Sequence, residues 1–156
     1  HTKDGYPCLH GEGSRYPGYF ITATTLTQRS EIRADGCALT RYIDAFESYD
    51  IDALVQLFTA DSVWEMPPFD TWYSGPQDIG DLSRNKCPAE GPGDMRFVVT
   101  TANGQSAAGM YMRNPETGRH EAFQLHVLDI KRDGISHVVA FMDPRLFDKF
   151  GLPPHL

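Results

Sequence analysis

The sequence of 156 residues lacks the features of several large protein classes. No apolar run approaches the ~18 residues of a membrane-spanning helix, and the start has neither the basic nor the apolar region of a signal peptide. Basic residues are few, 14 against 21 acidic ones, for a net charge of −7. This balance argues against an autonomous DNA- or RNA-binding module and against docking on an anionic membrane, both of which need a basic patch.

Metal, redox and nucleotide motifs are missing as well. Cys8, Cys37 and Cys87 are widely spaced without a CxxC pair, so we expect free thiols in a reducing cytoplasm. The histidines form no HxH or HExxH pattern, and we expect no metal site. There is no GxxxxGK[ST], no GxGxxG after a strand and no GxSxG elbow, so we also expect no nucleotide cofactor and no serine nucleophile.

The composition that remains is that of one globular domain with an extension. Apolar residues make up 40% of the chain, enough to build a core. Glycine and proline interrupt residues 1–36, where only residues 19–26 have the composition of a strand. We interpret residues 1–36 as an extension of unknown role and residues 37–156 as the domain.

Three helices are predicted in the first half of the domain. Leu39, Tyr42, Ile43 and Phe46 follow the i, i+3, i+4, i+7 spacing of an amphipathic helix. The same spacing repeats at residues 51, 54, 55 and 58, where Asp50 is placed to cap the helix. A short strand is expected at residues 61–66, and a third helix from the Gly-Pro pair at residue 75 to about residue 85.

The second half reads as a series of hairpins. Residues 95–101 and 105–112 flank Asn103-Gly104, the strongest short signal for a tight hairpin turn. Residues 120–130 and 135–142 flank a second such pair, Asp133-Gly134. This order predicts an α+β fold, with about three N-terminal helices packed on one face of a curved, mainly antiparallel sheet. Such an arrangement leaves a cone-shaped hollow in which a small molecule can bind.

Two explanations are open for the aromatic and methionine residues of the second half. They either fill an ordinary core or line an apolar pocket with adaptable side chains. The set comprises Trp64, Met66, Phe69, Trp72, Tyr73, Met110, Met112, Phe141 and Met142.

Two polar residues stand on an otherwise apolar strand face. Gln124 and His126 alternate with Leu128 and Ile130 on that face, so they form either a satisfied polar pair in the core or a polar handle at the pocket floor. Tyr42, on the apolar stripe of the first helix, can direct its hydroxyl into the same space.

Residues 41–67 resemble the NTF2-like superfamily, which includes ketosteroid isomerase and the SnoaL polyketide cyclases. The resembling segments are Arg41-Tyr42-Ile43, residues 50–55 and residues 61–67. The resemblance continues to the C-terminus and implies a fold in the form of an α+β cone. It also implies a pocket made by Tyr42, Trp64, Met66, Trp72, Met112, Gln124, His126, Met142 and Asp143.

The isomerase comparison implies lost catalysis. The isomerase uses a carboxylate base, and a tyrosine with a protonated aspartic acid as its oxyanion hole. Here the tyrosine is Tyr42, the base position is Met66, the protonated acid falls on His126, and a pocket tryptophan falls on Met142. A thioether cannot accept the proton, so steroid isomerisation is not expected and we assign no catalytic residue.

Two further segments, residues 66–75 and 146–156, are similar to the SnoaL-like C-terminal extension of certain actinobacterial extracytoplasmic-function sigma factors. That family implies a cytoplasmic regulatory domain that acts in transcription initiation. Such a domain would contact the sigma regions and RNA polymerase, or bind a hydrophobic ligand. Residues 1–40 are too few and too glycine-rich to form a sigma region. We therefore expect either a domain cut from a longer chain or a free-standing relative.

Three functional hypotheses follow. The first is a regulatory, ligand-sensing sigma-factor domain without turnover. The second is a small enzyme of the cyclase, isomerase or epoxide-hydrolase kind, acting on a hydrophobic molecule and using Tyr42, Gln124, His126 and Asp143. The third is a homodimerising scaffold, which is common in this fold.

Overall fold

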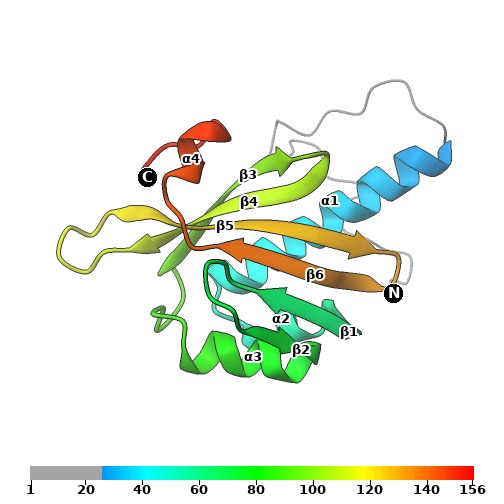
Figure 1. Ribbon diagram of the computed structural model, residues 1–156, viewed down its shortest axis with the longest axis horizontal. Coiled ribbons are helices and arrows are strands. Elements are labelled where there is room, and N and C mark those ends of the chain that lie inside the picture. The colour runs from blue at the N-terminus through cyan, green and yellow to red at the C-terminus, as the bar shows by residue number, and fades with distance from the viewer. Residues whose placement is uncertain (1–25) are drawn as a thin grey trace.

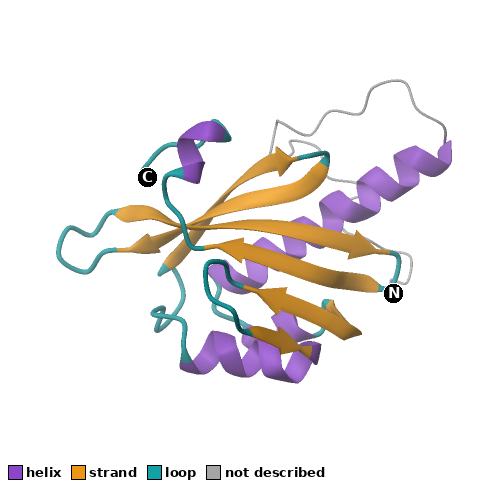
Figure 2. Ribbon diagram, in the orientation of Figure 1, coloured by secondary structure: helices purple, strands orange, loops and turns teal. Residues whose placement is uncertain are grey.

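The computed structural model describes the backbone of residues 26–156 and the side chains of residues 35–156 (Figures 1 and 2). Helices lead the chain and a hairpin-rich sheet follows. The elements are α1 (Leu26–Glu47), α2 (Ile51–Val55), β1 (Phe58–Glu65), β2 (Trp72–Ser74), α3 (Gly75–Asn85), β3 (Met95–Ala102), β4 (Gln105–Arg113), β5 (His120–Lys131), β6 (Gly134–Phe141) and α4 (Leu146–Lys149).

The strands form one six-stranded sheet in the order β2-β1-β6-β5-β4-β3. Every neighbouring pair is antiparallel except β1 and β6, which run parallel. Helices α1, α2 and α3 contribute to the main core against one face of the sheet, here called the inner face. The α+β prediction of helices on a mainly antiparallel sheet is therefore confirmed.

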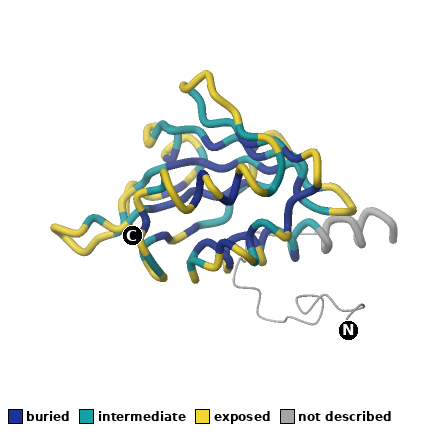
Figure 3. The backbone as a smooth tube through the Cα atoms, turned by 90° about the horizontal axis from the view of Figure 1, so that it is seen from below, coloured by how far each residue is buried: buried dark blue, intermediate teal, exposed yellow. Residues whose placement is uncertain are grey.

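The two sheet faces carry cores of unequal size. The inner face buries a large cluster that includes Phe46 of α1, Ile79 of α3, and Met110 and Leu128 of the sheet. Figure 3 shows the buried parts of the backbone in dark blue. The opposite, outer face holds a small cluster of Tyr111, Leu125, Phe147 and Leu152. Alternating residues of β4 and β5 thus point to different cores, as the period of two in a strand requires.

Close packing of the C-terminal segment on the outer face depends on a glycine. A Cβ atom at Gly109 would lie 2.7 Å from Cδ1 of Leu152 and 2.8 Å from Cε2 of Phe147. The missing side chain therefore lets α4 and the residues after it lie directly on β4. The hydroxyl of Tyr111 adds a hydrogen bond of 2.8 Å to the carbonyl oxygen of Pro153.

Several local predictions are confirmed. The side chain of Asp50 accepts a hydrogen bond of 3.0 Å from the backbone N–H of Ala53 and caps α2. Asn103 and Gly104 have φ values of 53° and 77° and form the tight turn between β3 and β4. The third helix begins at Gly75 and ends at Asn85, with proline in its first turn.

Other boundaries differ from the prediction. The second helix ends at Val55, and Phe58 opens β1 instead of continuing the helical stripe, because it pairs with Ile135 of β6. The first helix begins at Leu26, well before the expected stripe, so the proposed boundary at residue 37 falls inside α1. Of the segment 19–26, which has the composition of a strand, only Leu26 lies among the described residues, and it is helical. The short strand β2 was not predicted.

The expectation of free thiols is wrong for Cys37, which takes part in a disulfide bond, and holds for Cys87. Cys8 lies outside the described residues. Among residues that the structure describes, no cluster of three His, Cys, Asp or Glu side chains is arranged to hold a metal ion. No helix in this part of the chain has the length and apolar character needed to cross a membrane.

Candidate functional site

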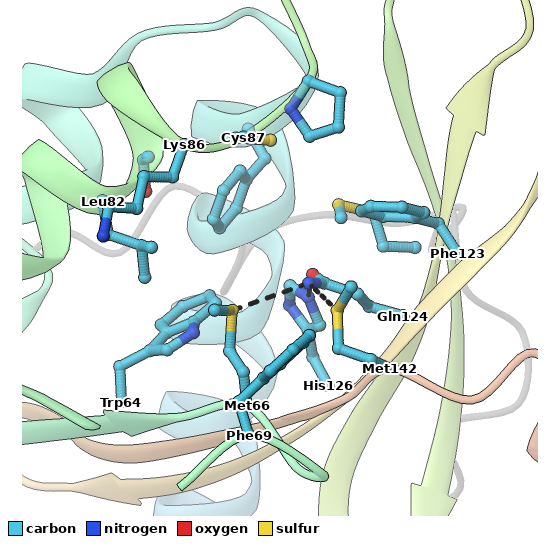
Figure 4. A pocket seen from close by; sticks show the side chains of 14 residues that line it. Trp64, Met66, Phe69, Leu82, Lys86, Cys87, Phe123, Gln124, His126 and Met142 are labelled. Carbon is cyan, nitrogen blue, oxygen red and sulfur yellow. Dashed lines mark hydrogen bonds between the residues drawn. The ribbon is translucent and has the colours of Figure 1, made fainter. Parts of the chain in front are cut away.

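A pocket of about 200 Å³ lies between α3 and the inner face of the sheet (Figure 4). Its walls come from five parts of the fold: α1, β1 with the loop after it, the end of α3, β4 with β5, and the residue after β6. The lining residues are Phe46, Trp64, Met66, Phe69, Leu82, Ser83, Lys86, Cys87, Pro88, Met110, Phe123, Gln124, His126 and Met142. Most of them are apolar, as in the usual small-molecule site.

His126 is the most deeply buried polar group of this pocket. Its side chain has 0% exposure, and four aromatic rings surround it with centroids between 5.3 and 6.0 Å away. These rings belong to Tyr42, Phe46, Trp64 and Phe97. Burial lowers the pKa of His126 from 6.5 to about 3, so the imidazole is neutral at physiological pH.

Both ring nitrogens of His126 are engaged. The hydroxyl of Tyr42 lies 2.7 Å from Nδ1, and Oε1 of Gln124 lies 2.8 Å from Nε2. A neutral imidazole satisfies both neighbours when Nδ1 accepts from the hydroxyl and the Nε2 hydrogen is donated to the amide oxygen. Burial also raises the pKa of Tyr42 well above its usual range, which keeps the phenol protonated as this donor.

The polar chain ends on two sulfur atoms. The side-chain nitrogen of Gln124 lies 2.7 Å from the sulfur of Met142 and 3.8 Å from the sulfur of Met66 (dashed lines in Figure 4). Thioether sulfur is a weak acceptor. The amide N–H groups of Gln124 therefore have only poor acceptors, on the wall of an apolar pocket.

The opposite wall comes from the end of α3 and the loop after it, where Lys86 and Cys87 lie (Figure 4). The ammonium group of Lys86 lies 5.8 Å from the ring centroid of Tyr73. Burial is the main cause that raises the pKa of the Cys87 thiol, and its sulfur lies 3.9 Å from that of Met95. The raised pKa thus favours the protonated thiol of Cys87 on this wall.

Five of the nine predicted pocket residues line this pocket: Trp64, Met66, Gln124, His126 and Met142. Tyr42 does not, since it reaches the pocket only through its hydrogen bond to His126. The structure thus brings together the polar chain that the strand pattern singled out.

The other three predicted residues lie elsewhere. Trp72 pairs with Glu65 in the sheet and is 66% exposed, because this register turns its ring toward the outer face. Met112 lies two residues beyond Met110 on β4 and packs against the core, one step past the pocket. Asp143 follows β6 and is bound by Arg145, whose hydrogen bonds are the main cause that lowers its pKa.

Phe123 is a pocket residue that sequence reasoning missed, since regular strand alternation would put it on the face opposite Gln124. Met110 pairs with Gln124, but the next pair is Tyr111 with Ala122, so Phe123 is an extra residue in β5. Such a bulge shifts the alternation of side chains, and Phe123 and Gln124 both line the pocket. The residues of α3 and its following loop were also missed, because the sequence gives no signal of how that segment closes over the sheet.

Comparisons with known proteins agree with the fold. Residues 39–138 match the model of the SnoaL-like domain. Two relatives, the ECF RNA polymerase sigma factor SigG of two Mycobacterium tuberculosis strains, are each 59% identical over 118 residues, which is 76% of this chain. The chain spans only 31% of the length of these relatives.

Solved structures share the fold at low sequence identity. An NTF-2 like protein of unknown function from Burkholderia xenovorans is 14% identical, with a TM-score of 0.58 over 75% of this chain and 86% of that one. An NTF2-like protein of unknown function from Cytophaga hutchinsonii is 13% identical, with a TM-score of 0.50 over 80% and 96%. With the family match covering most of its length, the chain belongs to the SnoaL-like family and has the NTF2-like fold.

Proposed function

We propose that this chain is a regulatory domain of an extracytoplasmic-function sigma factor and that its pocket binds a small, largely apolar molecule with an oxygen acceptor. The identity of 59% to part of SigG supports the sigma-factor context. In that context the chain acts in the cytoplasm, on transcription initiation, and its protein partners are the remaining sigma regions and RNA polymerase.

One observation carries the ligand proposal: the Gln124 amide has two weak sulfur acceptors in an apolar pocket. A carbonyl or ether oxygen is a stronger acceptor than a thioether, so it can take over these hydrogen bonds. The rest of such a ligand would replace water against Phe46, Trp64 and Phe123.

The geometry of His126 favours binding over acid–base catalysis. Its pKa of about 3 and its two occupied nitrogens leave it neither protonated nor free to exchange a proton near pH 7. Met66, at the base position of the resembling isomerase, contributes a thioether to the same pocket. These features support a domain that senses a ligand without converting it.

The ligand proposal is tested with 1-indanone and indane, two bicyclic probes of nearly the same shape that differ by one carbonyl oxygen. We expect 1-indanone to raise the melting temperature at lower concentrations than indane does. Gln124→Leu should abolish this preference, and Met112→Leu, outside the pocket, should keep it. Equal effects of both probes on the wild-type chain would contradict the proposal.

The sigma-factor proposal is tested separately by supplying the part of SigG that this chain does not match. We expect the two purified pieces to form a complex in size-exclusion chromatography. The absence of a complex from low to high salt would count against the regulatory role, whatever the indanone result.

A further inference from the structure

The polar chain in the core fixes the direction in which the Gln124 amide faces. Because the hydroxyl of Tyr42 donates to Nδ1 of His126, the ring hydrogen is on Nε2 and Oε1 of Gln124 accepts it. The amide nitrogen is therefore left on the side of two sulfur atoms, those of Met66 and Met142 (Figure 4). The core thus holds a hydrogen-bond donor against thioether sulfur, a weak acceptor.

The two sulfur atoms lie at different distances from this amide nitrogen. The sulfur of Met142 is 2.7 Å from Nε2 of Gln124, which leaves no room for an atom between them. The sulfur of Met66 is 3.8 Å away. An N–H···O bond spans about 2.9 Å, so an oxygen atom bonded to the Met66 sulfur can accept from the amide if the two bonds meet at a bent angle. The amide is placed to receive an oxygen atom carried by Met66.

We propose that Met66 is an oxidation site and that the Gln124 amide stabilises its sulfoxide. The oxidant is a peroxide. A lone pair of the sulfur attacks one peroxide oxygen, the O–O bond breaks and the S–O bond forms. Sulfur gives up two electrons, and hydrogen peroxide is reduced to water when the proton of the transferred oxygen moves to the departing one. Gln124 donates its N–H to the oxygen during and after this transfer, so it both speeds the reaction and holds the product.

A small oxidant has access to the Met66 sulfur. Met66 is only partly buried and follows directly on the end of β1. It lines a pocket of about 200 Å³, which is much larger than a peroxide molecule. The thiol of Cys87 lines the same pocket, but its raised pKa disfavours the thiolate that reacts with peroxide. Oxidation in the pocket is therefore directed to the thioether.

The other methionines provide comparisons within the same chain. Met95 and Met110 are 1% and 2% exposed, so we expect burial to protect both from peroxide. Met112 is partly buried, as Met66 is, but it lies outside the pocket that the Gln124 amide lines. The difference in rate between Met66 and Met112 thus measures what the pocket adds.

Oxidation of Met66 would close the pocket to the proposed ligand. The sulfoxide oxygen takes the amide hydrogen that a ligand carbonyl would otherwise accept, and it makes an apolar wall polar. This consequence rests on the proposed ligand pocket, whereas the modification itself does not. Reduction by a methionine sulfoxide reductase would restore the thioether and the ligand site.

The test treats the full chain with limiting hydrogen peroxide and follows each methionine by peptide mass spectrometry. We expect Met66 to form sulfoxide about fivefold faster than Met112, the factor that one neutral hydrogen bond supplies. Met95 and Met110 should stay reduced. Gln124→Leu should lower the Met66 rate about fivefold and leave the Met112 rate unchanged.

Gln105→Leu is the matched control, because it makes the same substitution at an exposed amide at the start of β4. It should change neither rate. Equal rates at Met66 and Met112 in the wild-type chain would overturn the proposal. A Met66 rate that Gln124→Leu leaves unchanged, with Met95 and Met110 still protected as a sign of intact folding, would overturn it as well.

The effect on the ligand site is measured with 1-indanone and indane after peroxide treatment. The preference for 1-indanone should disappear in the oxidised wild-type chain and survive in treated Met66→Leu, a substitution of similar volume. Loss of the preference in both chains would overturn the role of Met66 in regulation.

The outcomes separate this inference from the proposed function. If Met66 is oxidised selectively but the untreated chain never prefers 1-indanone, the modification site stands and the ligand proposal fails. If the untreated chain prefers 1-indanone but Met66 reacts no faster than Met112, the ligand pocket stands and the modification site is overturned.

Discussion

The hydroxyl of Tyr42 on α1 lies 2.7 Å from Nδ1 of His126 on β5, a hydrogen bond across 84 positions of sequence between two side chains with 0% exposure. The bond ties the first long helix to the centre of the sheet. It continues through Gln124 to the pocket wall, so one chain of polar groups joins the core to the candidate site.

Removing the hydroxyl of Tyr42 should destabilise the fold. Tyr42→Phe keeps the ring but leaves Nδ1 of His126 without a donor in a fully buried place. We expect a loss of about 1–3 kcal/mol in the free energy of unfolding, measured by urea denaturation. Tyr111→Phe is the control. The hydroxyl of Tyr111 is only partly buried against Pro153, so its removal should lower the free energy of unfolding by less. Equal losses would contradict the role assigned to Tyr42.

The stability of the chain should depend on pH through His126. In the unfolded chain its pKa returns to 6.5, whereas in the fold it is about 3. Between these values the unfolded state binds one proton more than the folded state, so stability decreases as pH falls from about 6.5, by up to about 1.4 kcal/mol per pH unit.

Urea denaturation at about pH 7 and about pH 5 measures this effect. His126→Gln removes the titrating group and should flatten the slope, although its absolute stability is lower. The control is His137→Gln, which removes the hydrogen-bond partner of Glu65 and should retain most of the slope. A slope in His126→Gln as steep as in the wild type would refute the assignment.

Gly109 should be required for the C-terminal segment to pack. Gly109→Ala puts a methyl group within 3 Å of Phe147 and Leu152, and we expect about 1–3 kcal/mol of destabilisation from overpacking. Phe147→Ala makes room for the methyl group, so the double variant should lose less than the two single losses together. If denaturation shows that the two losses in the free energy of unfolding simply add, the contact between the new methyl group and Phe147 is not what destabilises Gly109→Ala.

The site could be predicted from sequence only where local alternation holds. Gln124 and His126 stand out because polar residues interrupt an apolar strand face, and both line the pocket. Phe123 was missed because one extra residue in β5 reverses the alternation. Trp72 was misplaced because a large aromatic side chain is typical of an apolar pocket, whereas its pairing with Glu65 turns the ring outward.

The sequence by itself determined the elements with local causes. The stripe of Tyr42 and Phe46 made a helix, Asp50 capped the next one, and Asn103-Gly104 closed a hairpin, since capping and turn geometry depend on neighbours in the chain. The tertiary structure alone decided the parallel pairing of β1 with β6, the end of the second helix before Phe58, and the hydrogen bond from Tyr42 to His126. These features depend on contacts between distant residues, whose free energy of burial outweighs local preference and leaves no periodic trace in the sequence.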